Sequence, residues 1–208
     1  MENSGSCVYI VDDDELIRDS LKQLVNSVSL KVRVFSSAQS FLDYKLPNQA
    51  CCLVLDIRMP GMSGLELQDE LKKTGQLIPI IFITRHATVA MSVRALKAGA
   101  IDFIQKPFED QDILDSINHA IEYNRQARVV QAEINNATKY LQTLTVRERE
   151  ILVPIVAGTI NKEIASQFKM SESTVKTHRV RIMKKMQAES FAELVRMIEK
   201  IGLYPERN

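Results

Sequence analysis

The stretch from Cys51 to Gly64 reads CCLVLDIRMPGMSG. Its first five residues, Cys51–Leu55, form a nearly continuous apolar run, which is expected of a parallel strand covered on both faces. Asp56 follows this run directly, and a turn that contains two glycines, Pro60–Gly64, comes after it. The stretch therefore predicts a buried strand that ends at a carboxylate.

Four further β-rich runs surround this strand, and stretches with helical spacing of apolar residues separate them. We expect these strands at Cys7–Val11, Lys31–Phe35, Ile80–Thr84 and Ile101–Ile104. Strands that alternate with helices favour a parallel sheet with right-handed crossovers, here a doubly wound five-stranded α/β domain. A closed barrel would need more repeating units than this half of the chain supplies. Ser36 and Gln39 are predicted to form a capping box for the helix that carries Phe41 and Leu42.

Polar residues follow the carboxyl ends of four predicted strands. They are Asp12, Asp13 and Asp14 after the first strand, Asp56 after the third, Thr84 at the end of the fourth, and Lys106 after the fifth. Each of them alone has an ordinary structural role, such as a helix cap or a solvated charge. Together they lie at the edge where doubly wound sheets bind ligands.

The grouping of these residues predicts phosphoryl chemistry. Clustered carboxylates repel one another and need a cation, and ligands that are all oxygen favour Mg²⁺. A magnesium ion beside a lysine binds phosphoryl oxygens. A carboxylate can then act as the nucleophile and become an aspartyl phosphate, and Asp56 is the best candidate.

These motifs resemble the receiver domain of response regulators over roughly residues 6–124. The matching segments are Val11–Asp14, Asp56–Gly64, Ile83–Thr84 and Ala98–Phe108. The resemblance implies a flavodoxin-like fold in which Asp56 accepts phosphate from a sensor histidine kinase.

The resemblance also implies a role for each matching residue. Asp12, Asp13 and Asp56 would hold Mg²⁺ together with the backbone carbonyl of Arg58. Thr84 would donate a hydrogen bond to the phosphoryl group, and Lys106 would pair with it. Phe103 matches the aromatic residue that turns inward when Thr84 moves, and the Lys106–Pro107 bond is usually cis in this family.

Arg85 departs from the family pattern, in which a small residue follows the threonine. A guanidinium at this position can shield the acyl phosphate or pair with it, and it can equally point into solvent. Both interpretations remain open, so Arg85 is a candidate modulator of the phosphorylated state.

The segment from Asp110 to about Leu144 contains no Pro or Gly, and helix-forming residues dominate it. We expect a helical linker over residues 125–143, between a receiver domain at 1–124 and a second domain at 144–208. Its apolar residues follow the spacing of a two-helix seam: Ala127, Val130, Ile134, Ala137, Leu141 and Leu144. The alternative is a single helix that lies on its own domain.

The second half of the chain predicts a smaller all-α domain with a helix-turn-helix. Thr145 and Glu148 form a capping box, Gly158 ends that helix, a short helix starts at Asn161, and Ser171 caps the next one. No acidic residue occurs from Ser173 to Gln187. One face of this last helix is apolar: Val175, Ile182, Met183 and Met186. The other face is polar and mostly basic: Lys176, Thr177, Arg179, Arg181, Lys184 and Lys185.

These segments resemble the LuxR-type helix-turn-helix over about residues 144–203, and with the receiver in front the chain is similar to the FixJ/LuxR group of transcription regulators. The resemblance implies binding to paired half-sites in promoter DNA. The residues that would contact bases or phosphates, or support those that do, are Asn161, Lys162, Ser173, Thr174, Lys176, Thr177, His178, Val180, Arg181 and Lys184. It also implies contact with RNA polymerase and a homodimer that forms on phosphorylation.

Two features of this domain stay open. Pro154 lies within the first helix, where it removes an amide donor and predicts a kink. The final helix carries Phe191, Leu194, Val195 and Ile198, an apolar face that suits either dimerisation or packing inside the domain. Either this face or the linker helix is a candidate dimer contact.

The charge distribution agrees with two functions in one chain. Residues 1–124 carry 12 Lys or Arg and 17 Asp or Glu, whereas residues 125–208 carry 15 and 9. An acidic half joined to a basic half suggests a polyanion-binding domain under the control of the other. Three cysteines, no long apolar segment and no signal peptide favour a protein of the cytoplasm with no membrane contact.

The sequence favours a phosphorylation-controlled DNA-binding protein that is not an enzyme, and two other functions compete with this interpretation. A magnesium-dependent phosphatase with an aspartyl nucleophile generally has a second carboxylate two residues later, and here that residue is Arg58. A constitutive DNA-binding protein with a vestigial receiver would not need the full set of Asp12, Asp13, Asp56, Thr84 and Lys106, but the departure at Arg85 leaves this alternative open. Activation of transcription is the expected outcome of phosphorylation.

Overall fold

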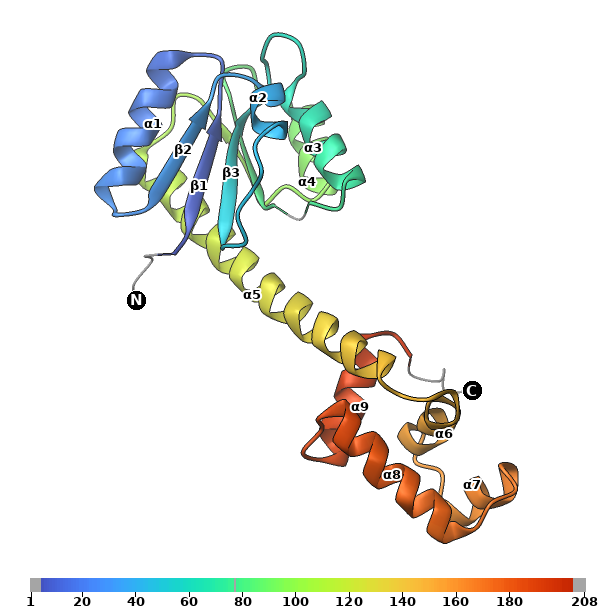
Figure 1. Cartoon of the computed structure of the whole chain (residues 1–208). Coiled ribbons are helices and arrows are strands. Elements are labelled where there is room, and N and C mark those ends of the chain that lie inside the picture. The colour runs from blue at the N-terminus through green and yellow to red at the C-terminus, as the bar shows by residue number, and fades with distance from the viewer. Residues whose placement is uncertain (1–4, 77, 204–208) are drawn as a thin grey trace. The chain divides into compact units, whose positions relative to one another are not determined.

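The computed structural model describes residues 5–76 and 78–203, and these divide into two compact units between Arg128 and Val129. The ends of the chain, 1–4 and 204–208, belong to the predicted domains 1–124 and 144–208 but lie outside the described residues. The first unit holds a sheet and helices, and the second is helical (Figure 1).

The first unit contains five parallel strands in the order β2-β1-β3-β4-β5, as expected for a doubly wound sheet. The elements are β1 (Cys7–Val11), α1 (Glu15–Ser27), β2 (Lys31–Phe35), α2 (Ala38–Leu42), β3 (Cys51–Asp56), α3 (Gly64–Lys73), β4 (Ile80–Thr84), α4 (Val89–Lys97), β5 (Asp102–Gln105) and the first part of α5 (Asp110–Gln142). The register pairs Val11 with Leu55 across β1 and β3, so the carboxyl ends of these strands meet at one edge.

The central strands β1, β3 and β4 are buried on both faces of the sheet. Side chains alternate along each strand, so successive residues face two different cores. Tyr9 and Val11 face a core that includes residues of α2, α3 and α4, whereas Val8 and Ile10 face a core formed with α1 and α5. This two-sided burial explains why the central strands are continuous apolar runs in the sequence.

Two local predictions were wrong by one residue. The predicted capping box of Ser36 and Gln39 does not form, because Ser37 is the N-cap of α2 and its hydroxyl accepts a hydrogen bond from the Ser40 amide. The chain needs one more extended residue after β2 before it turns into the helix. Similarly, β5 spans Asp102–Gln105 rather than the predicted Ile101–Ile104.

The second unit consists of the end of α5 and four shorter helices around their own core. These are α6 (Val146–Val156), α7 (Asn161–Gln167), α8 (Glu172–Met186) and α9 (Phe191–Lys200). The predicted capping box at Thr145 and Glu148 is present, and α6 continues through Pro154 to Val156. No helix among residues 5–76 and 78–203 is both long and apolar enough to cross a membrane.

Candidate functional site

A cavity of about 210 Å³ lies at the carboxyl edge of the sheet and brings together the polar residues predicted to meet there. It is lined by Asp12, Asp13, Asp14, Asp56, Arg58, Thr84, Arg85, His86 and Lys106. These residues end or follow β1, β3, β4 and β5, so the parallel topology alone accounts for their meeting.

Lys106 links two of the buried carboxylates. Its Nζ donates to Asp12 Oδ2 at 2.6 Å and to Asp56 Oδ1 at 2.8 Å. The exposed fractions of the three side chains are 8% for Lys106, 1% for Asp12 and 8% for Asp56. One ammonium therefore neutralises only one of two carboxylates that are shielded from water, and the group keeps a net negative charge.

The Asp56 carboxylate is held on its other side by the turn that follows β3. The Arg58 amide donates to Asp56 Oδ2 at 2.7 Å. Burial raises the pKa of Asp56 above its ordinary value and the nearby Asp12 adds to this, while the hydrogen bond and charge of Lys106 and the Arg58 amide oppose the rise. The protein thus keeps a carboxylate in a place where its charge is costly, which is typical of functional sites.

Gly64 allows this turn to lie against the end of β3. A Cβ built at Gly64 would lie 2.3 Å from the backbone oxygen of Asp56, which is closer than real Cβ atoms approach. The Gly64 amide also donates to the Ile57 carbonyl at 3.0 Å. Ser63 and Glu66 form a capping box at the start of α3, which the S-x-x-E spacing of the sequence would have revealed.

Arg85 has a partner that neither interpretation of the sequence named, and both interpretations stay predictions. Its guanidinium pairs with Asp14 Oδ2 at 2.8 Å, and 63% of its side chain is exposed. Asp14 Oδ1 accepts the Leu16 amide at the start of α1, so this aspartate is a helix cap as well as an ion-pair partner.

The remaining predicted residues lie around this group. Thr84 is buried and its Oγ1 accepts the His86 amide at 3.3 Å, whereas Asp13 is exposed. Phe103 on β5 is partly buried, with its ring centroid 6.4 Å from that of Phe82. The Lys106–Pro107 peptide bond is cis.

The donor atoms of this cavity fit a hard cation. Asp12, Asp13 and Asp56 offer carboxylate oxygens, which Mg²⁺ prefers. Within residues 5–76 and 78–203, no group of three or more His, Cys, Asp or Glu side chains is arranged as a ready-made metal site. Lys106 bridges Asp12 and Asp56 instead.

In the second unit, α7 and α8 form the predicted helix-turn-helix (Figure 1). Lys169 adopts a positive φ of 53° in the connection, and the Met170 amide donates to Ala165 O at 3.0 Å. Val175, Ile182 and Met186 of α8 are buried, which confirms its predicted apolar face. The spacing of the hydrophobic residues therefore determines which face of α8 packs against the core.

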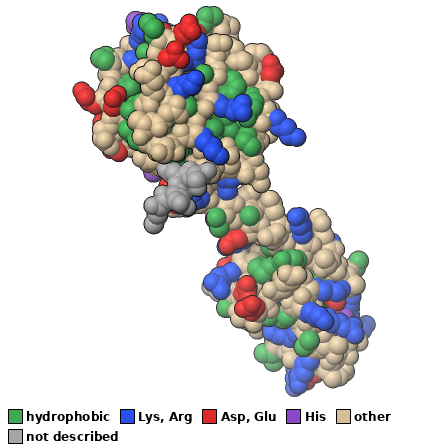
Figure 2. Space-filling model, turned by 60° about the vertical axis from the view of Figure 1, so that its left-hand side comes forward, with side chains coloured by type: hydrophobic (Ala, Val, Ile, Leu, Met, Phe, Trp, Pro, Cys, Tyr) green, Lys and Arg blue, Asp and Glu red, His purple; other side chains and the backbone are tan. Residues whose placement is uncertain are grey.

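The opposite face of α8 is open to solvent. The predicted DNA-contacting residues that are exposed are Lys162, Ser173, Thr174, Lys176, Thr177, Val180, Arg181 and Lys184. Figure 2 shows many Lys and Arg side chains on the visible face of this unit. Asn161 is partly buried, and its Oδ1 accepts from Arg179 at 3.1 Å, which ties α7 to α8.

His178 is also partly buried, and its Nδ1 is the one buried side-chain nitrogen or oxygen without a hydrogen-bond partner in the described part of the chain. Among the predicted residues, Asn161 and His178 are thus more enclosed than the rest. The other eight lie where a polyanion can reach them.

Sequence reasoning found Glu148 as a cap but missed its second partner. Glu148 is 3% exposed, and Lys185 on α8 donates to its Oε2 at 2.6 Å. Burial opposes ionisation of Glu148, but the hydrogen bonds of Lys185 and Thr145 outweigh it and hold its pKa below the usual range. The sequence did contain a signal for this partner, because Glu148 lies on the same face of α6 as the buried Ile151 and Leu152. A buried carboxylate needs a cation beside it.

The apolar face of α9 is largely used inside the unit. Leu194 and Ile198 are buried in its core, and Val195 and Ile201 pack against it. Phe191 is 42% exposed, with the Arg179 guanidinium 5.6 Å from its ring centroid. Core packing therefore accounts for most of this face.

Comparison with known protein families gives two matches. Residues 8–118 match the response regulator receiver domain, and residues 142–198 match the bacterial regulatory proteins of the luxR family.

Individual relatives extend over most of the chain. Nodulation protein W of Bradyrhizobium diazoefficiens is 44% identical over 97% of this chain and 88% of its own. The transcriptional regulatory protein FixJ of Rhizobium meliloti is 43% identical over 95% and 97%. Among solved structures, the response regulator StyR has a TM-score of 0.83 at 43% identity, over 94% of this chain and 99% of its own.

Proposed function

The chain belongs to the response regulators that join a receiver domain to a LuxR-type helix-turn-helix domain, and from this premise we propose that phosphorylation of Asp56 by a partner histidine kinase controls DNA binding through α8. The observation that carries the assignment of Asp56 is its position between Lys106 and the Arg58 amide. The proposed domains are the receiver at 1–124, a helical linker at 125–143 and the DNA-binding domain at 144–208.

Asp56 is the favoured nucleophile because it matches the phospho-acceptor of the receiver motif and because its side chain is less buried than that of Asp12, with 8% against 1% exposed. Asp12 accepts from Lys106 and from the Asp14 amide, and Asp14 caps α1 and pairs with Arg85. In the transfer, a carboxylate oxygen of Asp56 attacks the phosphorus of the kinase phosphohistidine. The phosphorus–nitrogen bond breaks with its electron pair on the imidazole, and an aspartyl phosphate forms.

The chain supplies charge and hydrogen bonds for this step. Lys106 Nζ lies 2.8 Å from Asp56 Oδ1 and would pair with the transferred group, and the hydroxyl of Thr84 would donate a hydrogen bond to it. The Mg²⁺ ion would be held by Asp12, Asp13, Asp56 and the Arg58 carbonyl. When bound, it supplies positive charge to the phosphoryl oxygens.

The response to phosphorylation is proposed to pass through Thr84 and Phe103 to dimer formation and DNA binding. Lys176, Thr177, Val180 and Arg181 would approach base edges in the major groove. Contacts with phosphates, or support for the residues that make them, would come from Asn161, Lys162, Ser173, Thr174, His178 and Lys184. A homodimer would bind paired half-sites in the cytoplasm and activate transcription through contact with RNA polymerase.

The test compares the wild-type chain with Asp56→Asn, which keeps the shape of the side chain. Each protein is treated with acetyl phosphate and Mg²⁺, the added phosphate is measured by mass spectrometry, and DNA affinity is measured on sites found by genome-wide mapping. Asp43→Asn, an aspartate outside the acidic cavity, is the control. We expect phosphate incorporation and tighter DNA binding in the wild type and the control alone. Equal DNA affinity with and without phosphodonor in all three proteins would refute the proposal.

A further inference from the structure

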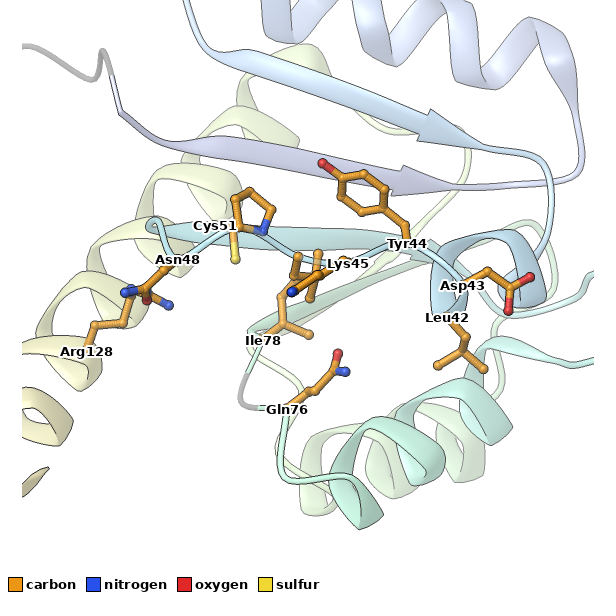
Figure 3. A pocket seen from close by; sticks show the side chains of 11 residues that line it. Leu42, Asp43, Tyr44, Lys45, Asn48, Cys51, Gln76, Ile78 and Arg128 are labelled. Atoms are coloured by element: carbon orange, nitrogen blue, oxygen red, sulfur yellow. The ribbon is translucent and has the colours of Figure 1, made fainter.

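A second, larger cavity of about 490 Å³ lies in the first unit and shares no residue with the acidic cavity (Figure 3). One wall is the segment between α2 and β3, with Cys51 at the start of β3. The opposite side comes from Gln76 and Ile78, ahead of β4, and from Arg128 on α5. Its volume is within the range of small-molecule sites in proteins.

The cavity contains two cations that have no counter-ion among the described residues. Within residues 5–76 and 78–203, neither Lys45 nor Arg128 forms an ion pair, and the Arg128 guanidinium donates only to the neutral amide oxygen of Asn48. The acidic residue in the lining, Asp43, accepts from Gln39 Nε2 at 2.9 Å. Its carboxylate lies at the α2 end of the cavity, far from Arg128 (Figure 3).

The rest of the lining is uncharged and partly apolar. Leu42, Leu46 and Ile78 pack at the edge of the first core. The sulfur of Cys51 also faces this space (Figure 3). Burial raises the pKa of the Cys51 thiol to about 11, although the Arg128 charge acts against it, so the thiol is neutral at physiological pH. A site with two cations and an aliphatic wall suits a ligand with an anionic head and an apolar body.

We propose that this cavity binds a small aliphatic organic anion, whose head group contacts Arg128 and Lys45 and whose body lies against Leu46 and Ile78. The planar guanidinium of Arg128 can donate two parallel hydrogen bonds to a carboxylate or a phosphomonoester. The ammonium of Lys45 adds a point charge on a flexible stem, which can follow the head group.

Occupancy would also add a link between α5 and the segment before β3, which the hydrogen bond from Arg128 to Asn48 already joins. Arg128 lies on α5, and Lys45 lies on the segment that leads from α2 into β3. A bound anion would bridge the two and so would stabilise the first unit by an amount that rises with the logarithm of its concentration above the dissociation constant. This site is independent of phosphorylation at Asp56.

The experiment titrates the full-length chain with cyclohexanecarboxylate and follows the methyl signals of Leu46 and Ile78 by NMR. Cyclohexylmethanol is the uncharged analogue, and cyclohexyl phosphate and inorganic phosphate distinguish the two kinds of head group. Arg128→Gln and Lys45→Gln each remove one cation. Arg125→Gln is the matched control, because Arg125 lies on the same helix outside the cavity and pairs with Glu122.

We expect saturable shifts with a dissociation constant on the order of 1 mM, a modest affinity for a probe of this size. Affinity should fall at least tenfold in Arg128→Gln and in Lys45→Gln and stay unchanged in Arg125→Gln. Binding of the phosphate ester alone, with the same response to the variants, also supports the site and identifies its head group. The proposal is overturned by equal binding of the uncharged alcohol, by binding that both cation variants retain, or by no shift with any probe.

Discussion

Replacement of Glu148 by glutamine tests whether the buried ion pair between α6 and α8 holds the DNA-binding unit together. Glutamine keeps the shape of the side chain and can still accept the Thr145 amide, but it leaves the Lys185 ammonium without its counter-ion. Breaking a fully buried pair costs about 3–5 kcal/mol, whereas an exposed pair contributes about 0–1 kcal/mol.

The exposure of the two partners places this pair between those limits. Glu148 is 3% exposed, but the side chain of Lys185 is 35% exposed and can turn toward water once the pair is lost. We therefore expect a loss of about 2 kcal/mol in the free energy of unfolding. For a unit of this size the melting temperature would fall by about 8–16 °C.

The assay is differential scanning calorimetry of the full-length chain, in which the transition of the second unit is followed. Glu150→Gln is the matched control, because Glu150 lies on the same helix and forms an exposed pair with Arg147 at 2.9 Å. Its effect should stay below about 0.5 kcal/mol. If Glu148→Gln destabilises the unit no more than this control does, the reasoning from burial is wrong.

The pH dependence separates charge from packing. The pKa of Glu148 is lower in the folded chain than its ordinary value, so the contribution of the charged form is fully present above an unfolded pKa of about 4.3. It is lost as the pH falls through the folded pKa. The difference between wild type and Glu148→Gln should therefore shrink below about pH 4, and a difference that stays constant down to pH 3 would contradict an electrostatic origin.

Three further predictions concern both units. Gly64→Ala should destabilise the first unit by about 1–3 kcal/mol, because its Cβ would meet the Asp56 backbone oxygen, while Gly5→Ala, which meets nothing within 4 Å, should be neutral in the same calorimetry. Arg85→Ala should shorten the lifetime of phosphorylated Asp56 in a dephosphorylation time course, with Arg94→Ala as a control that breaks the exposed pair with Asp69 instead; an unchanged lifetime would exclude a role for Arg85. Lys184→Gln should reduce the slope of log affinity for DNA against log salt by about 1, uniformly across sequences, and a change confined to one sequence would instead indicate contact with a base.

Most of the fold was predictable because it rests on local patterns. Four of the five strands begin where predicted, at Cys7, Lys31, Cys51 and Ile80, since apolar runs with β-branched residues are strong signals of buried strands. The errors were at boundaries that the pattern does not resolve. Two adjacent serines are equally good N-caps in sequence, and only the path of the chain after β2 selects Ser37.

The candidate site was predictable to the level of topology and no further. Parallel strands place Asp12, Asp56, Thr84 and Lys106 at one edge, and the structure has them there. The choice of partners was not predictable, because it depends on side chains that meet from distant parts of the chain. The pairs Arg85–Asp14 and Lys185–Glu148 leave no periodic trace in the sequence.

The charge balance around Asp56 suggests a role for Arg85 after phosphorylation. Two buried carboxylates now share the single ammonium of Lys106. Phosphorylation would replace the single charge of Asp56 by one of about −1.5 to −2, so Lys106 alone would leave the group more negative than before.

A cation beside Lys106 and the proposed Mg²⁺ would lower this negative charge further, and Arg85 lines the same cavity. The pair that it now forms with Asp14 is exposed and contributes at most about 1 kcal/mol, whereas charge-assisted hydrogen bonds to phosphoryl oxygens are among the strongest that a side chain makes. We therefore expect Arg85 to exchange Asp14 for the phosphoryl group. The cost of releasing Arg85 is small because its present partner is a carboxylate at the rim and not a buried one.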